Sequence, residues 1–287
     1  MLASYYDRHM ALVDGVAYGW VGRDQPRPLP LAPGQRWVQS GVSRDAYFAL
    51  QDDGQLWSWS AASQPAVLLM RGVARFAAGA SGWFAIDRAG VLWHASAHAS
   101  ATTPAPQPQR VAEDVIAACI GDSADYYITR DGRLFARGLA HRGQYGDGKL
   151  TATPGFVATA TDAVAVKAHT GHAIHLRRDG AVMGTGGNRF GPLSSHGLGD
   201  KADRWGLVFE AAVAVATGSR HSLAIRADGS LWAWGEGFAI APSRILEKAT
   251  AVAAGDTATI ALTADGTLWQ WDGGGVPRRL SLPPVPR

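Results

Sequence analysis

The chain has 287 residues, of which 47% are hydrophobic and 18% charged, a composition typical of globular and not of disordered proteins. The net charge is only +3, and no basic run exceeds the pairs Arg177-Arg178 and Arg278-Arg279, which argues against nucleic-acid binding. The single cysteine, Cys119, excludes an internal disulfide, and no apolar stretch is long enough to cross a bilayer.

A tight turn between two short apolar strands recurs seven times along the chain. The turns contain the glycines Gly15, Gly54, Gly90, Gly132, Gly180, Gly229 and Gly266. All but the third follow an aspartate, and Asp-Gly between alternating apolar residues predicts a hairpin with a type I′ turn. We interpret these aspartates as structural, because an Asp side chain closes such a turn through its own backbone.

Each hairpin is preceded by a run of small residues and followed by a segment that contains proline. VAVAT before the sixth hairpin and APSRIL after it are examples. Each unit therefore predicts four antiparallel strands, and seven units of about 41 residues predict an all-β, seven-bladed β-propeller. The expected blades of this single domain, 1–287, are 1–35, 36–71, 72–114, 115–160, 161–210, 211–247 and 248–287.

The repeat also predicts how the blades pack. Small residues suit the first strands, which crowd around the axis, and the aromatic residues of the third strands suit the wider space between blades. The Leu or Val before each aromatic residue should point to the opposite face of its sheet. Every blade consists of consecutive residues, so we expect the ring to close by packing or through a short N-terminal strand.

The sixth unit carries the fullest copy of the repeat, G-x-x-H-S-L-A-x-x-x-D-G-x-x-W-x-W-G. Its residues are Gly218, His221, Ser222, Leu223, Ala224, Asp228, Gly229, Trp232, Trp234 and Gly235. A second motif follows the third strand as GLAHRGQYGDG from Gly138 and as GGNRFGPLSSHGLG from Gly186. Together these motifs resemble the regulator of chromosome condensation family, and the Ala- and Arg-rich, degenerate repeats resemble its bacterial-type members.

This resemblance implies a seven-bladed propeller and two kinds of function. One is guanine-nucleotide exchange on a small GTPase together with chromatin binding. The other is the role of bacterial propellers of this type, which include a protein inhibitor of β-lactamase. We favour an inhibitor, immunity or effector-type role and expect the protein to be a monomer. We expect it to be cytoplasmic, because the first residues do not resemble a signal peptide.

Propeller geometry places the turns between first and second strands on the same face as the long connections 94–114, 138–155 and 184–210. The stretch from His94, rich in Ala, Thr and Pro, is expected to be mobile. Arginine and aromatic residues are enriched at interface hot spots, so we predict that a protein partner docks on this face. The predicted contact residues are His141, Arg142, Tyr145, Arg189, Phe190, His196, Arg204 and Trp205 in the connections, and Tyr5, Tyr6, Arg44, Trp83 and Arg220 in the turns.

Other chemistries receive less support from the sequence. His172 and His175 fall on opposite faces of one strand, so we expect no metal site there, and the glycine-rich segments lack the context of a phosphate loop. We therefore predict a non-enzymatic scaffold without a cofactor. The alternative is a propeller lyase or hydrolase with a site at the channel mouth, for which Asp122, Asp125, Arg220 and His221 are the first candidates.

Overall fold

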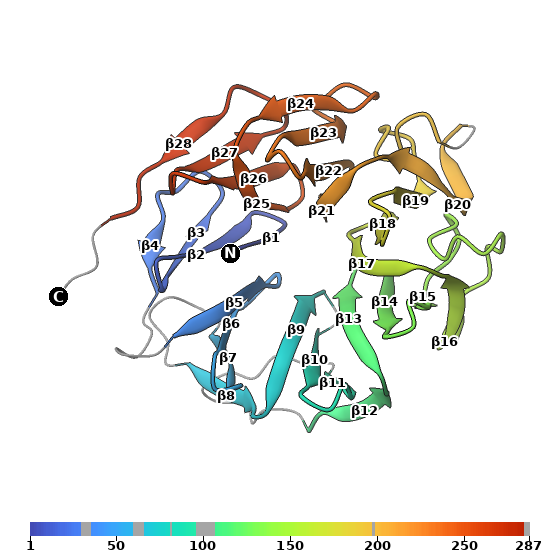
Figure 1. The fold of residues 1–287 in the computed structure, drawn as a ribbon, viewed down its shortest axis with the longest axis horizontal. Helices are drawn as coiled ribbons and strands as arrows, with labels where there is room; N and C mark the ends of the chain where they lie inside the picture. Colours follow the sequence, from blue (N-terminus) through green and yellow to red (C-terminus); the bar gives the residue numbers. More distant parts are fainter. Residues whose placement is uncertain (30–35, 60–65, 81, 96–106, 197–198, 284–287) are drawn as a thin grey trace.

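The computed structural model describes residues 1–29, 36–59, 66–80, 82–95, 107–196 and 199–283. These residues form seven sheets of four antiparallel strands, arranged as a ring around a common axis (Figure 1). The prediction of an all-β, seven-bladed propeller is therefore confirmed. Within the described ranges, no helix has the length and apolar character that crossing a lipid bilayer requires.

Each blade consists of four strands that are consecutive in the sequence, and the first strand of each lies nearest the axis (Figure 1). In chain order the strands are β1 (Leu2–Tyr5), β2 (Arg8–Val13), β3 (Val16–Val21), β4 (Arg27–Pro28), β5 (Trp37–Val42), β6 (Tyr47–Gln51), β7 (Leu56–Trp59), β8 (Val67–Met70), β9 (Val73–Gly79), β10 (Gly82–Asp87), β11 (Leu92–Ala95), β12 (Gln109–Ala112), β13 (Val115–Ile120), β14 (Ala124–Thr129), β15 (Leu134–Gly138), β16 (Thr153–Ala160), β17 (Ala163–Ala168), β18 (His172–Arg177), β19 (Val182–Gly187), β20 (Lys201–Phe209), β21 (Ala212–Thr217), β22 (His221–Arg226), β23 (Leu231–Gly235), β24 (Ser243–Leu246), β25 (Ala249–Ala254), β26 (Ala258–Thr263), β27 (Leu268–Asp272) and β28 (Arg278–Leu280).

Small residues line the axis because the inner strands converge there. The channel between them has a volume of about 180 Å³. A Cβ atom added to Gly79 of β9 would lie 2.5 Å from the carbonyl oxygen of Ile120 in the next blade. The crowding explains why alanine and glycine recur in the first strand of each unit.

The aromatic residues of the third strands fill the spaces between blades. Trp232 and Trp234 of β23 pack in one apolar cluster with Phe209 of the preceding blade. Leu231, which precedes them, points to the other face of the sheet and packs in the cluster with Ala249 of the following blade. The predicted division between the two faces of the third strand is confirmed for this blade.

The hairpin turns correct one detail of the sequence-based prediction. Only the first blade has a two-residue loop, with Val13 paired to Val16 and φ of 49° at Asp14 and 78° at Gly15, as a type I′ turn requires. In the other six blades, one more residue enters the loop. In the sixth, for example, the Gly229 N–H donates to Arg226 O at 3.0 Å, which is a type I turn followed by a glycine bulge.

The turn aspartates have the structural role expected of them. In the sixth blade, Asp228 Oδ1 accepts a hydrogen bond of 2.8 Å from the backbone N–H of Ser230. The equivalent bond recurs at Asp53, Asp131, Asp179 and Asp265. In the third blade, where Ala89 stands at this position, Asp87 accepts the bonds from Ala89 and Val91 instead.

The ring closes between the last blade and the first without a shared strand. An apolar cluster joins Trp20 of β3 to Ile260 of β26. The Trp20 Nε1–H donates to Gln270 Oε1 at 3.1 Å, and the Gln270 Nε2–H donates to Gly22 O at 3.0 Å. Closure therefore depends on side-chain packing and on hydrogen bonds centred on Gln270.

Candidate functional site

The turns between first and second strands lie at the same end of each blade as the connections between third and fourth strands, because neighbouring strands are antiparallel. We call this end of the ring the loop face, and the opposite end, with the Asp-Gly turns, the turn face. Two long connections on the loop face, 139–152 and 188–200, largely fall in the described residues. A third long connection follows β11, and its residues 96–106, which include the segment expected to be mobile, lie outside the described residues.

The connection 139–152 fastens the fourth blade to the fifth. The Tyr145 ring is buried in an apolar cluster with Ala173 of β18, and its O–H donates to Gly138 O at 2.6 Å. The Thr185 hydroxyl of the fifth blade donates to Gly143 O at 2.7 Å. The structure therefore corrects the expectation that Tyr145 offers its ring to a partner, because this ring fills the space between two blades.

The connection 188–200 fastens the fifth blade to the sixth in the same way. Leu193, in the same motif position as Tyr145, is fully buried in the cluster that contains Trp234. The Trp234 Nε1–H donates to Pro192 O at 2.7 Å, and Asn188 Oδ1 accepts a bond of 3.0 Å from the Leu193 N–H. This anchoring leaves Arg189 and Phe190 exposed on a preformed support.

Large apolar side chains are exposed mainly on the loop face. Of nine exposed large apolar residues among those described, five lie in connections between third and fourth strands: Leu139, Leu150, Phe190, Ile240 and Val276. Phe190 and Ile240 come from neighbouring blades, and a Cβ atom on Gly191 would lie 3.2 Å from Ile240 Cγ1. Clustered exposed apolar residues mark interaction surfaces more often than isolated ones do.

A hydrogen-bonded network spans the channel mouth on the loop face. The Tyr5 and Tyr6 hydroxyls of the first blade both donate to the Asp122 carboxylate of the fourth, Tyr6 at 2.7 Å. The His169 ring stacks on Tyr5, with 5.0 Å between centroids, and its Nδ1 lies 3.1 Å from Ser219 Oγ. These contacts join blades that are far apart in the sequence and narrow the entrance to the channel.

Burial keeps the central groups of this network neutral. Burial and the hydrogen bond to Asp122 raise the pKa of Tyr5 far above its usual value of 10.0. Burial lowers the pKa of His169 from 6.5, so its imidazole is neutral at pH 7. With a neutral phenol donating to a carboxylate, the network is suited to holding the mouth together.

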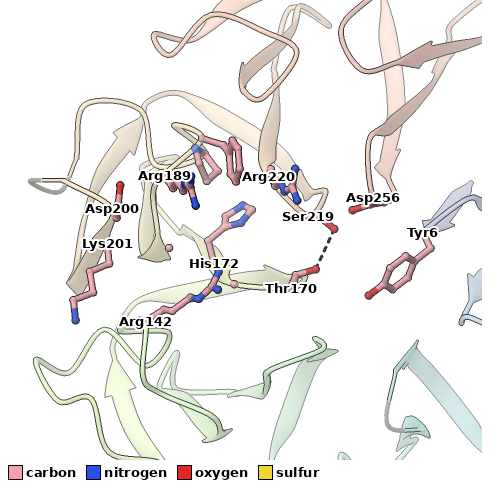
Figure 2. Close-up of a pocket in the computed structure, with 14 residues that line it drawn as sticks. Tyr6, Arg142, Thr170, His172, Arg189, Asp200, Lys201, Ser219, Arg220 and Asp256 are labelled. Atoms are coloured by element: carbon pink, nitrogen blue, oxygen red, sulfur yellow. Dashed lines mark hydrogen bonds between the residues drawn. The ribbon is translucent and has the colours of Figure 1, made fainter.

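Beside this network lies a pocket of about 630 Å³, formed by the loops and turns of the fourth to seventh blades and by Tyr6 of the first. Arg142, Arg189 and Arg220 border the middle of this pocket, with His172 between them (Figure 2). Arg220 is held by Glu236 at 3.1 Å and lies over the Phe190 ring, 4.4 Å from its centroid. The pocket thus combines guanidinium groups with an exposed aromatic ring.

The structure divides the thirteen predicted contact residues by exposure. His141, Arg142, Arg189, Phe190, Arg204, Arg44 and Arg220 are exposed, whereas Tyr6, His196 and Trp205 are half-buried. The structure buries Tyr5, Trp83 and Tyr145.

Besides Tyr145, three of the predicted contact residues need correction: Trp83, Tyr5 and Trp205. Trp83 lies in the apolar cluster between the second and third blades, and Tyr5 is held in the mouth network, so neither side chain is available on the surface. Trp205, on the outer strand β20, packs against His175 with 4.5 Å between ring centroids, which places it on the side of the ring.

The four candidate catalytic residues do not come together. Asp122 bonds to the two tyrosines, whereas Asp125 pairs with Arg137 at 3.1 Å. Arg220 pairs with Glu236, and His221 is buried, with its Nε2 2.9 Å from Thr259 Oγ1. The described residues also contain no group of three or more His, Cys, Asp or Glu side chains that could hold a metal ion.

Residues 212–238 match the family model of the regulator of chromosome condensation (RCC1) repeat. The chain is a seven-bladed propeller whose sixth blade carries an RCC1 repeat. A comparison with curated proteins gives no match. Among solved structures, Prp20p from Saccharomyces cerevisiae is 18% identical, with a TM-score of 0.73 over 89% of this chain and 80% of Prp20p.

Two further structures show the same fold. Yeast RCC1 (Prp20) bound to Kap60 is 17% identical, with a TM-score of 0.75 over 88% of this chain and 74% of that chain. The ectodomain of the Arabidopsis thaliana receptor kinase ACR4 is 14% identical, with a TM-score of 0.62 over 98% of this chain and 97% of that chain. At these identities the likeness concerns the fold alone.

In this propeller, the histidine of the repeat stabilises the fold. His172 and His221 occupy the same repeat position, and each reaches a hydroxyl on the second strand of the next blade. The His172 Nε2 lies 2.9 Å from Ser222 Oγ, and the His221 Nε2 lies 2.9 Å from Thr259 Oγ1. Both bonds therefore join neighbouring blades.

Sequence reasoning did not select several residues of the pocket and the mouth. Thr170 and Ser219 occupy the turn position of Asp122 in their own blades, and their hydroxyl oxygens lie 3.0 Å apart, as Figure 2 shows. Asp256, which the sequence did place in a turn at the channel mouth, holds the same position in the last blade and lines the pocket. The repeat register could have identified these positions, because equivalent turn residues form one ring around the mouth.

Proposed function

We propose that this protein is a non-enzymatic scaffold that docks a protein partner on its loop face. The main support is the gathering of exposed apolar side chains on the connections between third and fourth strands, next to the arginine-lined pocket. Aromatic and arginine side chains around a pocket are typical of interface hot spots. Phe190, with Arg220 over its ring, is the centre of this surface.

The support beneath the surface favours tight binding. The two long connections are fixed to the next blade by Tyr145 and by Leu193, so their tips are preformed. A preformed surface loses little conformational entropy on binding. We therefore favour an inhibitor, immunity or effector-type role, in which one partner occupies the face for a long time.

The structural neighbours are consistent with a binding role. The structure of Prp20p was reported with its binding to Gsp1p and histones, and the yeast RCC1 structure contains Kap60. A propeller of this architecture can therefore present a protein-binding surface. The partner of this chain has to be found by experiment.

A capture experiment tests the docking face. The purified protein, immobilised, is incubated with an extract of the source organism, and the bound proteins are identified and purified. We expect Phe190→Ala with Ile240→Ala to weaken binding of the purified partner at least about tenfold, since hot-spot residues contribute 2 kcal/mol or more. Leu207→Ala with Val213→Ala is the matched control, because both side chains are exposed but lie outside the loop-face connections.

Equal binding by the two double variants would contradict the proposed face. Loss of binding with both would contradict it as well, provided that circular dichroism shows both variants folded.

A further inference from the structure

We propose that the pocket bordered by Arg142, Arg189 and Arg220 binds an acidic segment of the docked protein, with carboxylates paired to the guanidinium groups. The inference rests on the proposed docking function and adds the chemistry of the partner. Guanidinium and carboxylate groups form the strong, bidentate hydrogen bonds that fix orientation at an interface.

The three guanidinium groups come from three different blades and surround one space. Arg142 belongs to the connection of the fourth blade, Arg189 to that of the fifth, and Arg220 to the first turn of the sixth. Among the described residues, Arg142 and Arg189 form no ion pair, whereas Arg220 is already oriented by Glu236. Two cationic groups in the pocket are therefore free to pair with a ligand.

The backbone of the fifth blade provides a seat for Arg142. A Cβ atom added to Gly171 would lie 3.2 Å from Arg142 Nη1, and one added to Gly187 would lie 3.5 Å from Arg142 Cδ. The Arg142 side chain therefore lies across two positions without side chains and reaches the pocket from the neighbouring blade. This close approach restricts the side chain before any ligand binds, which reduces the entropy lost on pairing.

The charge balance of the pocket favours an anion. Its lining contains four cationic side chains, the three arginines and Lys201, and the two carboxylates of Asp200 and Asp256. Glu236 pairs with Arg220, so one positive charge remains in excess. Figure 2 shows the arginines around the middle of the pocket and the two carboxylates toward its ends. The charged groups nearest to an anion at the centre of the pocket would thus be guanidinium groups.

The shape and surroundings favour an acidic polypeptide over a nucleic acid. A cavity of about 630 Å³ with cations from three blades matches several carboxylates on one chain better than a single small ion. Phe190 lines the pocket and Ile240 lies against the adjacent Gly191, so both offer apolar contact to a peptide side chain.

A direct binding measurement tests this chemistry. Fluorescein-labelled hexaglutamate is titrated with the full chain at low ionic strength, and anisotropy is recorded. We expect saturable binding that Arg142→Gln with Arg189→Gln weakens by about a hundredfold, since each lost charged hydrogen-bond pair costs about tenfold in affinity. The control is Arg71→Gln with Arg178→Gln, which removes the same charge from exposed positions on the turn face and should change affinity less than about twofold.

Three results would overturn the inference: no saturable binding, equal weakening by the two double variants, or more effective competition by oligothymidylate or inorganic phosphate than by unlabelled hexaglutamate. The docking face is tested separately, because Phe190→Ala with Ile240→Ala retains every arginine. If hexaglutamate fails to bind while Phe190→Ala with Ile240→Ala still weakens binding of the purified partner, the proposal of an acidic segment is contradicted and the proposed docking face is supported.

Discussion

Acid should unfold this protein in the range where histidine side chains titrate, well above the range where carboxylates do. Burial lowers the pKa of His9, His175 and His221 to about 4 and that of His172 to about 3. In the unfolded chain a histidine titrates near 6.5. As the pH falls through 6.5, the unfolded state therefore takes up protons that the native state does not, and the free energy of unfolding decreases.

The size of the effect follows from these values. Between pH 7 and pH 5, each of the four histidines should lose about 2 kcal/mol of stabilisation, or about 8 kcal/mol together. That sum approaches the total stability of most domains, about 5–15 kcal/mol. Below about pH 4, His9, His175 and His221 protonate in the native state too, and His172 follows below about pH 3, so their contribution levels off.

The turn aspartates act in a different pH range. Hydrogen bonds from Thr263 and Thr267 lower the pKa of Asp265 to about 2, from an ordinary value of 3.8. Its stabilisation is present above 3.8 and is lost as the pH falls through the native value. A transition between pH 6.5 and 4 therefore reports on the histidines.

Urea unfolding at a series of pH values measures this directly. We expect the free energy of unfolding to fall between pH 6 and 5 as the unfolded chain takes up at least about four more protons than the native protein. That uptake corresponds to at least about 5 kcal/mol per pH unit, and His169 adds to it in the same direction. His175→Phe keeps an aromatic ring against Trp205 and should reduce the slope by about one proton.

A slope near zero between pH 6.5 and 5 would refute the reasoning, since the buried rings would then be protonated in the native protein. An unchanged slope in His175→Phe would refute the assignment of the protons to buried histidines.

Three further predictions concern single residues of the fold. Gly229→Ala should lower the free energy of unfolding by about 1–3 kcal/mol, because its φ is +80° and a Cβ atom would lie 3.1 Å from Lys248 Cα. Gly15→Ala, which has open space around it, should lower the free energy of unfolding by less, as calorimetry would show. Tyr145→Phe should lower stability by about 1 kcal/mol in urea unfolding and leave partner capture unchanged, because its hydroxyl bonds within the scaffold. Tyr5→Phe, which removes a donor to the Asp122 carboxylate, should lower the melting temperature by about 2–4 °C.

Each of these predictions has an experimental outcome that would contradict it. Equal losses at Gly229 and Gly15 would show that contact with the next blade does not matter. Weaker partner capture by Tyr145→Phe would show that the Tyr145 hydroxyl contributes to partner binding. A melting temperature unchanged in Tyr5→Phe would mean that the bond across the channel contributes nothing to the ring.

The fold could be predicted from the sequence because its signals are local and repeated. The glycine at Gly229, the Asp228 side chain and the Trp232-Trp234 pair act within a few residues, and seven copies reinforce one another. The type I′ assignment failed in five of the six Asp-Gly turns, because one additional residue in the loop changes the turn and composition does not reveal it.

The site could be predicted only in part, because exposure depends on contacts between blades. Tyr145 looks like a surface aromatic residue in a long loop, yet it fills the space beside Ala173. Its alignment with Leu193 in the second copy of the motif was a signal of burial that the sequence did contain. The bond from Tyr5 to Asp122 joins residues 117 positions apart, and no local pattern marks such a pair.

Hydrogen exchange on the complex with the captured partner tests the proposed docking face most directly. We predict that binding protects backbone amides in 139–150, 188–196 and 236–242, which carry the exposed tips of the loop face. Protection confined to the Asp-Gly turns of the opposite face, or to the outer strands, would contradict the account.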